Sequence, residues 1–206
     1  RSERQEKIFG TARNQVLFDV SLKVSQGTCL GILGESGSGK STLGRVICGL
    51  LKPDTGEVKI QDVSVYASRN GRKNLQKRLS VVFQDYTTSA NPRFRVKEII
   101  AEGLAARERN QKIRLNRLEE INRLLELVGL NSSYANRYPH ELSGGQLQRV
   151  CIARAVACQP EIILFDEAIS SLDAHTQIQI MDLLHDLKEK LGLTYIFITH
   201  DLTSVT

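Results

Sequence analysis

The amino-acid sequence predicts an α/β fold organised around a phosphate-binding turn. Residues 28–33 form a short apolar run typical of a buried strand, and residues 43–51 carry the apolar spacing typical of a helix. Between them lie Gly34, Glu35, Ser36, Gly37, Ser38, Gly39, Lys40, Ser41 and Thr42. They match the phosphate-loop pattern of a glycine, four residues, a glycine, a lysine and a hydroxyl. This order of strand, turn and helix predicts a nucleoside triphosphate site.

The chemistry of this turn follows from the geometry of a helix start. The first backbone N–H groups of a helix lack partners within the helix, and the helix dipole favours an anion beside them. Glycines let the backbone wrap closely around a phosphate. We therefore expect Lys40 to reach the β and γ phosphates and Ser41 to place its hydroxyl on Mg²⁺. A plain glycine-rich turn is disfavoured, because every fixed position of the motif matches in the right context.

Polar side chains follow three further apolar runs, at residues 79–83, 162–165 and 195–199. Gln84 follows the first run, Asp166 and Glu167 follow the second, and His200 follows the third. The carboxyl ends of parallel strands meet at one edge of a sheet. We therefore expect these side chains to surround the γ phosphate.

Each of these strand-end groups has an expected role and an ordinary alternative. Asp166 is expected to hold Mg²⁺, directly or through water, and Glu167 to orient and deprotonate the attacking water. His200 is expected to contact the γ phosphate and that water. However, a strand-end acid can also be a helix cap, and a lone histidine is usually structural.

A second glycine-rich stretch offers a second anion site. It consists of Ser143, Gly144, Gly145 and Gln146, at the start of a helix predicted over residues 145–158. Ser143 with Gln146 is by itself a capping box, which is the structural alternative. The two glycines expose backbone N–H groups at a helix start, which favours an anion. Because this stretch lies in the inserted helical part, we expect it to serve the nucleotide of a partner chain.

The remaining segments divide into a core and an insertion. Alternating apolar and polar residues predict strands at 16–24 and 56–65, in a small antiparallel sheet, with turns at 53–56 and Asn70-Gly71. Further helices are predicted at residues 96–104, 118–128 and 174–191. The charge-rich residues 107–123 are expected to form the solvent-exposed face of a helix. We thus expect a nucleotide-binding core at residues 1–85 and 159–206 and a helical subdomain at residues 86–158.

The composition of the 206-residue chain is that of a globular protein, with 41% hydrophobic and 25% charged residues. No run of apolar residues is long enough to span a bilayer. The net charge of +5 is spread along the chain and aromatic residues are few, so direct nucleic-acid binding is not expected. The four cysteines lack metal-site spacing and are expected to be reduced core residues. The absence of an initial methionine suggests a piece of a longer protein.

Together these motifs resemble the nucleotide-binding subunit of ATP-binding cassette (ABC) transporters over nearly the whole chain. Gly34 to Ser41 resemble Walker A, Gln84 the Q-loop, Leu142 to Gln146 the signature, Ile162 to Glu167 Walker B, Ser170 to Asp173 the D-loop, and His200 the switch histidine. The resemblance implies a P-loop NTPase (RecA-like) core. It also implies ATP contacts by Asp173, and a role for Gln84 as a Mg²⁺ ligand that acts with Glu167 and His200.

The resemblance further implies partners and a location. Two such subunits, identical or sister, pack head to tail, with each ATP between the phosphate loop of one and the signature of the other. They act with membrane permease subunits and, through these, with an extracytoplasmic substrate-binding protein. The subunit is then a bacterial ATPase that lies peripherally on the cytoplasmic face of the cell membrane.

Finer details are similar to the nickel and peptide importer branch, and most similar to nickel import subunits. The branch is indicated by Phe83-Gln84-Asp85 followed by Asn91-Pro92-Arg93, and by residues 137–141 before the signature. The similarity to nickel import subunits lies in residues 147–151, Asp166-Glu167-Ala168 and 198–202, and Ala168-Ile169 stands where most relatives have Pro-Thr. The expected cargo is nickel or a nickel chelate. The alternatives are a di- or oligopeptide cargo and, more remotely, a non-transport ABC ATPase acting on DNA or ribosomes. The adenine-stacking aromatic residue of the family lacks a clear equivalent, because Phe9 is a poor substitute.

Overall fold

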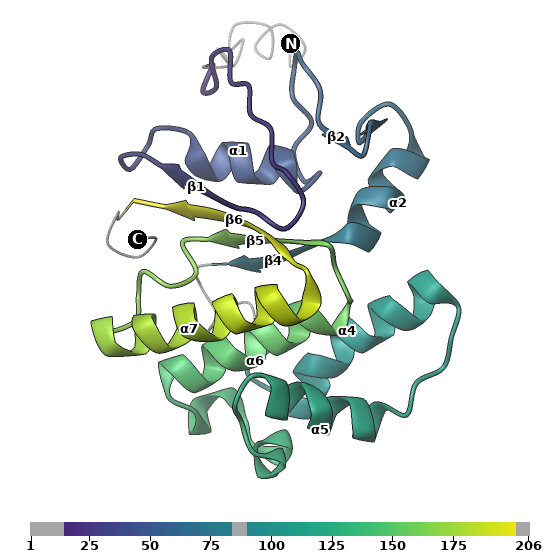
Figure 1. The fold of residues 1–206 in the computed structure, drawn as a ribbon, viewed down its shortest axis with the longest axis vertical. Coiled ribbons are helices and arrows are strands. Elements are labelled where there is room, and N and C mark those ends of the chain that lie inside the picture. Colours follow the sequence, from purple (N-terminus) through teal and green to yellow (C-terminus); the bar gives the residue numbers. More distant parts are fainter. Residues whose placement is uncertain (1–14, 84–89, 201–206) are drawn as a thin grey trace, which may run out of the picture.

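A four-stranded parallel sheet forms the centre of the protein (Figure 1). The structure, a computed structural model, describes residues 15–83 and 90–200. The strand order is β1-β6-β5-β4, with bounds β1 Cys29–Leu33, β6 Thr194–Thr199, β5 Ile162–Asp166 and β4 Leu79–Phe83. All adjacent pairs are parallel, as the predicted α/β fold requires. Each connection therefore crosses over through helices.

Helices cover both faces of this sheet (Figure 1). α1 lies on one face, and α4, α5, α6 and α7 form a layer on the other. The α-helices are α1 Lys40–Ile47, α2 Arg69–Arg78, α4 Val96–Gln111, α5 Arg117–Leu127, α6 Gly144–Ala157 and α7 Ala174–Leu191. Two short 3₁₀ helices, η1 Ser132–Asn136 and η2 Pro139–Glu141, lead into α6. The layer beyond the sheet contains the predicted helical insertion.

The two-residue repeat of the strands explains why both faces of the sheet are apolar. In β5 and β6, Leu164, Ile196 and Ile198 belong to the cluster that Ile47 of α1 covers. The intervening residues Ile163, Phe165, Tyr195 and Phe197 belong to the larger cluster on the opposite face. Because successive side chains of a strand point to opposite faces, uninterrupted apolar runs are required where both faces are covered.

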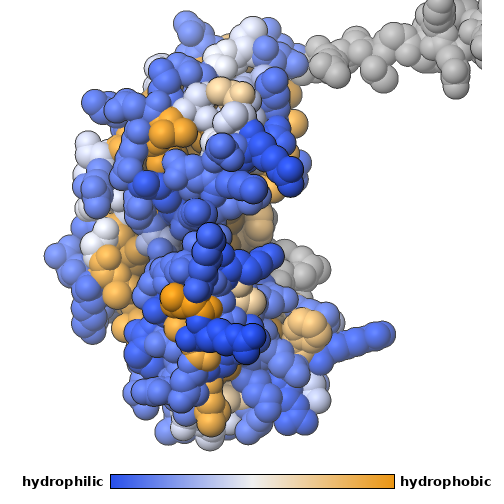
Figure 2. All heavy atoms as spheres, turned by 90° about the vertical axis from the view of Figure 1, so that its right-hand side faces the viewer, coloured by the Kyte–Doolittle hydropathy of each residue, from blue (hydrophilic) through white to orange (hydrophobic). Residues whose placement is uncertain are grey.

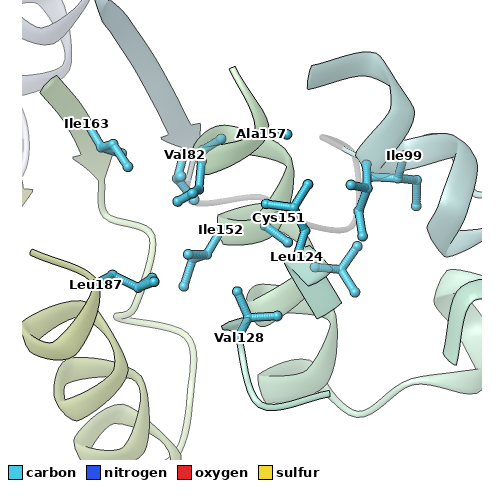
Figure 3. Close-up of a cluster of buried hydrophobic side chains, with 14 of the residues drawn as sticks. Val82, Ile99, Leu124, Val128, Cys151, Ile152, Ala157, Ile163 and Leu187 are labelled. Carbon is cyan, nitrogen blue, oxygen red and sulfur yellow. The ribbon is translucent and has the colours of Figure 1, made fainter. Parts of the chain in front are cut away.

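The larger cluster joins the sheet to the inserted helices without a break. Figure 3 shows Val82 and Ile163 of the sheet near Ile152 of α6, and Leu124 of α5 in the same cluster. The hydroxyl of Ser80 in β4 also donates a hydrogen bond to the carbonyl oxygen of Ala155 in α6, at 3.1 Å. The helical segment is thus an insertion in chain order that shares its core with the sheet.

The predicted small antiparallel sheet is a short hairpin. The expected single strand at 56–65 is wrong: β2 Lys59–Ile60 pairs antiparallel with β3 Val63–Ser64. Gln61 and Asp62 have φ values of 48° and 63°, and two left-handed residues make the tight turn that joins adjacent antiparallel strands. This turn interrupts the apparent alternation.

The strand expected at residues 16–24 is absent from the described part of the chain. Val16, Phe18, Val20 and Leu22 alternate as a strand would, and all four side chains are exposed. Within residues 15–83 and 90–200, no strand runs beside this segment to complete a ladder. Alternation alone therefore did not produce a strand here, because a strand needs a hydrogen-bonding neighbour.

Two smaller expectations are also wrong. Asn70-Gly71 lies in the first turn of α2, where the Ser68 side chain caps the helix by accepting a hydrogen bond from the Gly71 N–H. Cys29 is exposed rather than in the core, because β1 has no neighbour on its outer edge among the described strands. Cys151 is buried, and burial raises the pKa of its thiol to about 11.

The surface in Figure 2 is mostly hydrophilic, with small separate hydrophobic areas. Across the described residues, no helix combines the length and apolar character needed to cross a membrane. Most of the buried hydrophobic side chains belong to the larger of the two sheet-facing clusters.

A close approach between α4 and α6 at Gly103 allows a direct test of this packing. A Cβ on Gly103 would lie 2.3 Å from the carbonyl oxygen of Arg154 and 2.8 Å from the Cβ of Ala157. We predict that Gly103→Ala lowers the free energy of unfolding by about 1–3 kcal/mol, because overpacking outweighs the better helix propensity of alanine. Urea denaturation measures this. Arg109→Ala, on the exposed part of α4, is the control, and equal stabilities would contradict the packing described.

Candidate functional site

The phosphate loop lies between β1 and α1, as predicted. α1 begins at Lys40, and its N-cap residue Gly39 has φ 93° and offers no side-chain cap to the first helical N–H groups. Gly37 also has a left-handed φ, at 84°. A Cβ on Gly39 would lie 3.1 Å from the carbonyl oxygen of Val16, so this position needs glycine for space as well as conformation. The open helix start is a suitable anion site.

Lys40 turns its ammonium group into this loop. Its Nζ atom donates hydrogen bonds to the carbonyl oxygens of Gly34 and Glu35, at 2.5 and 2.6 Å. The side chain is only 7% exposed. A buried cation whose hydrogen bonds, among the described residues, go to backbone carbonyls at the start of a helix favours an added anion. The exposed hydroxyl of Ser41 follows directly in the first turn.

The other predicted groups emerge at the same edge of the sheet. Leu33 is in register with Thr199, and Phe83 is in register with Asp166. Asp166 is in register with Ile198, so the four strands end within one residue of one another. His200 follows β6 at this edge as Glu167 follows β5. Gln84 follows β4 in the chain, but it lies outside the described residues. Its expected role as a Mg²⁺ ligand therefore stays a prediction.

Asp166 has the properties of a carboxylate prepared for a cation. Its Oδ1 atom is buried and has no hydrogen-bond partner. Its pKa is raised, first by burial and then by the neighbouring Glu167, while Arg45 and Lys40 lower it. An orphaned carboxylate oxygen needs a partner, and oxygen ligands of this kind suit Mg²⁺. The buried, unpartnered oxygen of Asp166 therefore fits the predicted magnesium site, for which Ser41 stays the predicted second ligand.

Glu167 and His200 come together beyond the strand ends. The Nδ1 atom of His200 lies 3.6 Å from the Oε1 atom of Glu167, and half of the histidine side chain remains exposed. Glu167 has φ 50°, an uncommon value for a residue with a Cβ, and its N–H donates to the carbonyl oxygen of Ile198 at 2.8 Å. This strained turn aims the carboxylate at His200. The two groups predicted to handle water are thus adjacent.

The glycine-rich stretch at residues 143–146 starts α6 with a complete capping box. The Ser143 hydroxyl accepts from the Gln146 N–H at 3.3 Å, and the Ser143 N–H donates to the Gln146 side chain at 3.0 Å. The Nε2 atom of Gln146 also donates to the Tyr134 hydroxyl at 3.1 Å. The capping box is therefore present, and Gly144 and Gly145 are the first residues of the helix.

Asp173 is used as the N-cap of α7. Its carboxylate accepts from the N–H and the hydroxyl of Thr176, at 3.0 and 2.7 Å, and these bonds lower its pKa. Thr176 in turn touches the start of α6, since a Cβ on Gly145 would lie 2.5 Å from its methyl group. The residue expected to contact ATP is thus engaged within its own chain.

Sequence reasoning missed several residues that support this site. The Tyr134 hydroxyl accepts a hydrogen bond from Gln146, and Thr176 and Gln177 bond to the loop before α7. The positive charge of Arg45 lowers the pKa of Asp166. Only Asp173 followed three residues later by Thr176 had a local signal, that of a helix cap. Gln177 bonds residues five and eight positions before it, Tyr134 bonds a residue twelve positions after it, and Arg45 in α1 acts on Asp166 in β5. None of these spacings is a helix-cap or turn pattern.

The fold and this edge of the sheet define a P-loop nucleotide-binding domain. The chain belongs to the ABC transporter family, because the sequence model of that family, described as ABC transporter, matches residues 17–170. This confirms the resemblance found in the motifs.

Two curated relatives have names that match the expected branch. The chain is 46% identical over 201 residues to the oligopeptide transport ATP-binding protein OppF of Bacillus subtilis, covering 96% of this chain and 66% of that protein. It is 43% identical over 199 residues to the nickel import ATP-binding protein NikE of Brucella suis, covering 96% of this chain and 74% of that protein. The chain thus spans about two thirds to three quarters of these relatives.

A solved structure supports the fold. The ATP-binding cassette MJ0796, in a dimeric post-hydrolysis state with ADP and Pi, superposes with a TM-score of 0.79 and 34% sequence identity. The match covers 92% of this chain and 82% of that one. The predicted α/β fold of a P-loop NTPase is therefore shared with a solved ATP-binding cassette.

The raised pKa of Asp166 predicts how stability depends on pH. A raised pKa in the folded state means that the ionised carboxylate destabilises the fold, so the cost is present at neutral pH and disappears as the pH falls through that pKa. We predict that Asp166→Asn is more stable than the wild type at pH 7 without Mg²⁺ or nucleotide. The gain should vanish at acid pH. Urea titrations at several pH values measure it, and a less stable variant at pH 7 would contradict the assignment.

Proposed function

We propose that the chain is the ATP-hydrolysing subunit of an ABC importer. The observation that carries this proposal is the convergence of Glu167 and His200 at the sheet edge where Lys40 fills the phosphate loop. Binding and hydrolysis require such groups together. Membership of the ABC transporter family supports the same reading.

The arrangement suggests a division of labour among the described residues. Lys40 and the open start of α1 bind and orient the phosphates. Mg²⁺, held by Ser41 and Asp166 and, as the resemblance implies, by Gln84, supplies charge neutralisation on the phosphates when bound. Glu167 accepts a proton from the attacking water, and His200 keeps the carboxylate and the water in place.

The site as described belongs to one half of a composite pocket. We infer that the start of α6 binds the nucleotide of a second ABC subunit, identical or sister. The N–H groups of Gly144 and Gly145 lie in the first turn of the helix, where an anion is favoured. MJ0796, the solved relative, is described as dimeric. The complete transporter then adds membrane permease subunits and an extracytoplasmic substrate-binding protein, with this subunit on the cytoplasmic face of the membrane.

The cargo is the finer part of the proposal. We favour nickel or a nickel chelate, supported by the NikE relative at 43% identity. A peptide cargo is the second candidate, and OppF at 46% identity supports it equally well. The residues of the nucleotide site serve either cargo, because they act on ATP.

Removal of the proposed base tests the hydrolysis. We predict that Glu167→Gln lowers kcat by about 10²–10⁴-fold, because the amide cannot accept the proton, while ATP binding is retained. The uncleaved ATP should then stabilise the dimer. Phosphate release and size-exclusion chromatography with ATP measure these effects. Normal turnover by this variant would show that Glu167 is not the base.

Deletion of the gene separates the two cargoes. We predict that cells without the chain lose uptake of radioactive nickel and regain it when the wild type is restored. Cells given the Glu167→Gln variant are the matched control, and they should remain deficient. Loss of peptide uptake with nickel uptake unchanged would instead establish the peptide importer.

A further inference from the structure

The first turn of α7 contains a glutamine that holds the loop next to the proposed base. The Nε2 atom of Gln177 donates to the carbonyl oxygens of Ile169 and Leu172, at 3.2 and 3.0 Å. Both acceptors lie in the loop that follows Glu167 and leads into α7. The side-chain amide of Gln177 thus connects α7 to this loop through two hydrogen bonds.

Hydrogen bonds also hold the end of the loop that follows Glu167. The N–H and the hydroxyl of Ser170 donate to the carbonyl oxygen of Glu167, at 3.3 and 2.9 Å. Glu167 has a left-handed φ of 50°, and such a conformation persists only when the surroundings over-determine it. The bonds from Ser170 and Gln177 are suited to this task, because they fix the backbone on the carboxyl side of the strained residue.

The neighbouring Thr176 faces a different element. Its methyl group packs against Gly145 in the first turn of α6, at a distance that leaves no room for a Cβ on residue 145. Its hydroxyl is bound to Asp173, so the side chain is fixed in this orientation. Adjacent residues of one helical turn therefore contact the Glu167 loop on one side and the glycine-rich start of α6 on the other.

We propose that the first turn of α7 is a bridge between these two sites, with Gln177 as a positioning residue for Glu167 and Thr176 as the contact with α6. This inference rests on the proposed function. Glu167 serves the nucleotide bound by its own chain, and the start of α6 serves the nucleotide of the partner. The bridge therefore couples the water-handling group at one nucleotide to the signature contact at the other.

The positioning role is tested by steady-state ATP hydrolysis of the complex purified from membranes. Gln177→Ala is expected to lower kcat at least about ten-fold with little change in KM for ATP, since a small displacement of a reacting group is costly. Gln179→Ala is the matched control, because Gln179 lies on the same helix and its side chain pairs with His175, away from the Glu167 loop. Equal kcat values for the two variants would overturn the proposal.

A second variant guards against a folding defect. Gln177→Glu keeps the shape of the side chain but removes both N–H donors, so it should reproduce the loss in kcat. In thermal unfolding, both Gln177 variants should have midpoints close to that of Gln179→Ala. If Gln177 had only a structural role, its variants would instead lower the midpoint and leave kcat per folded subunit unchanged. That last result would overturn the proposal.

The bridge itself is tested by combining variants. Thr176→Ser keeps the hydroxyl bound to Asp173 and removes the methyl group that touches Gly145. Because both side chains act through one turn, the double variant with Gln177→Ala should lose less kcat than the product of the separate losses. A loss equal to that product would refute the bridge. A wild-type complex without ATPase activity would refute the proposed function and the bridge with it.

Discussion

The parallel register of the four strands is the constraint on which the site depends. It sets Leu33 level with Thr199 and Phe83 level with Asp166, so the turns that follow the strands meet at one edge. This convergence disfavours the ionised form of Asp166, because burial and the adjacent acid Glu167 both raise its pKa. Lys40 and Arg45 offset part of that cost. A cation and a polyanion together would satisfy the remaining charges.

The apolar layers make this register necessary. Leu164, Ile196 and Ile198 face α1, and the alternate residues face the helical layer, so a slip of one residue would exchange the two sets. The same packing places the start of α6 beside α7, through Thr176 and Gly145. The edge where the strands end and the glycine-rich start of α6 are therefore joined by direct packing through the first turn of α7.

Much of this arrangement was predictable from the sequence. The glycine pattern before Lys40, and apolar runs ending in acids or histidine, are local signals with direct structural meanings. The hairpin at residues 59–64 was not predictable from alternation, because two left-handed residues, Gln61 and Asp62, interrupt it without a glycine. The strand expected at 16–24 needed a neighbour that no local pattern supplies. Contacts such as Tyr134 with Gln146 depend on how distant segments pack, so they required the fold.

The central claim is that the strand ends surround a triphosphate and that a second copy or sister subunit completes the pocket. A crystal structure of the full-length Glu167→Gln variant with Mg²⁺ and ATP tests it most directly. The account predicts a dimer in which the γ phosphate contacts Lys40 of one subunit and the first turn of α6 in the other, with residue 167 and His200 facing the water. Nucleotide bound away from residues 34–42, or fully enclosed by a single subunit, would contradict it.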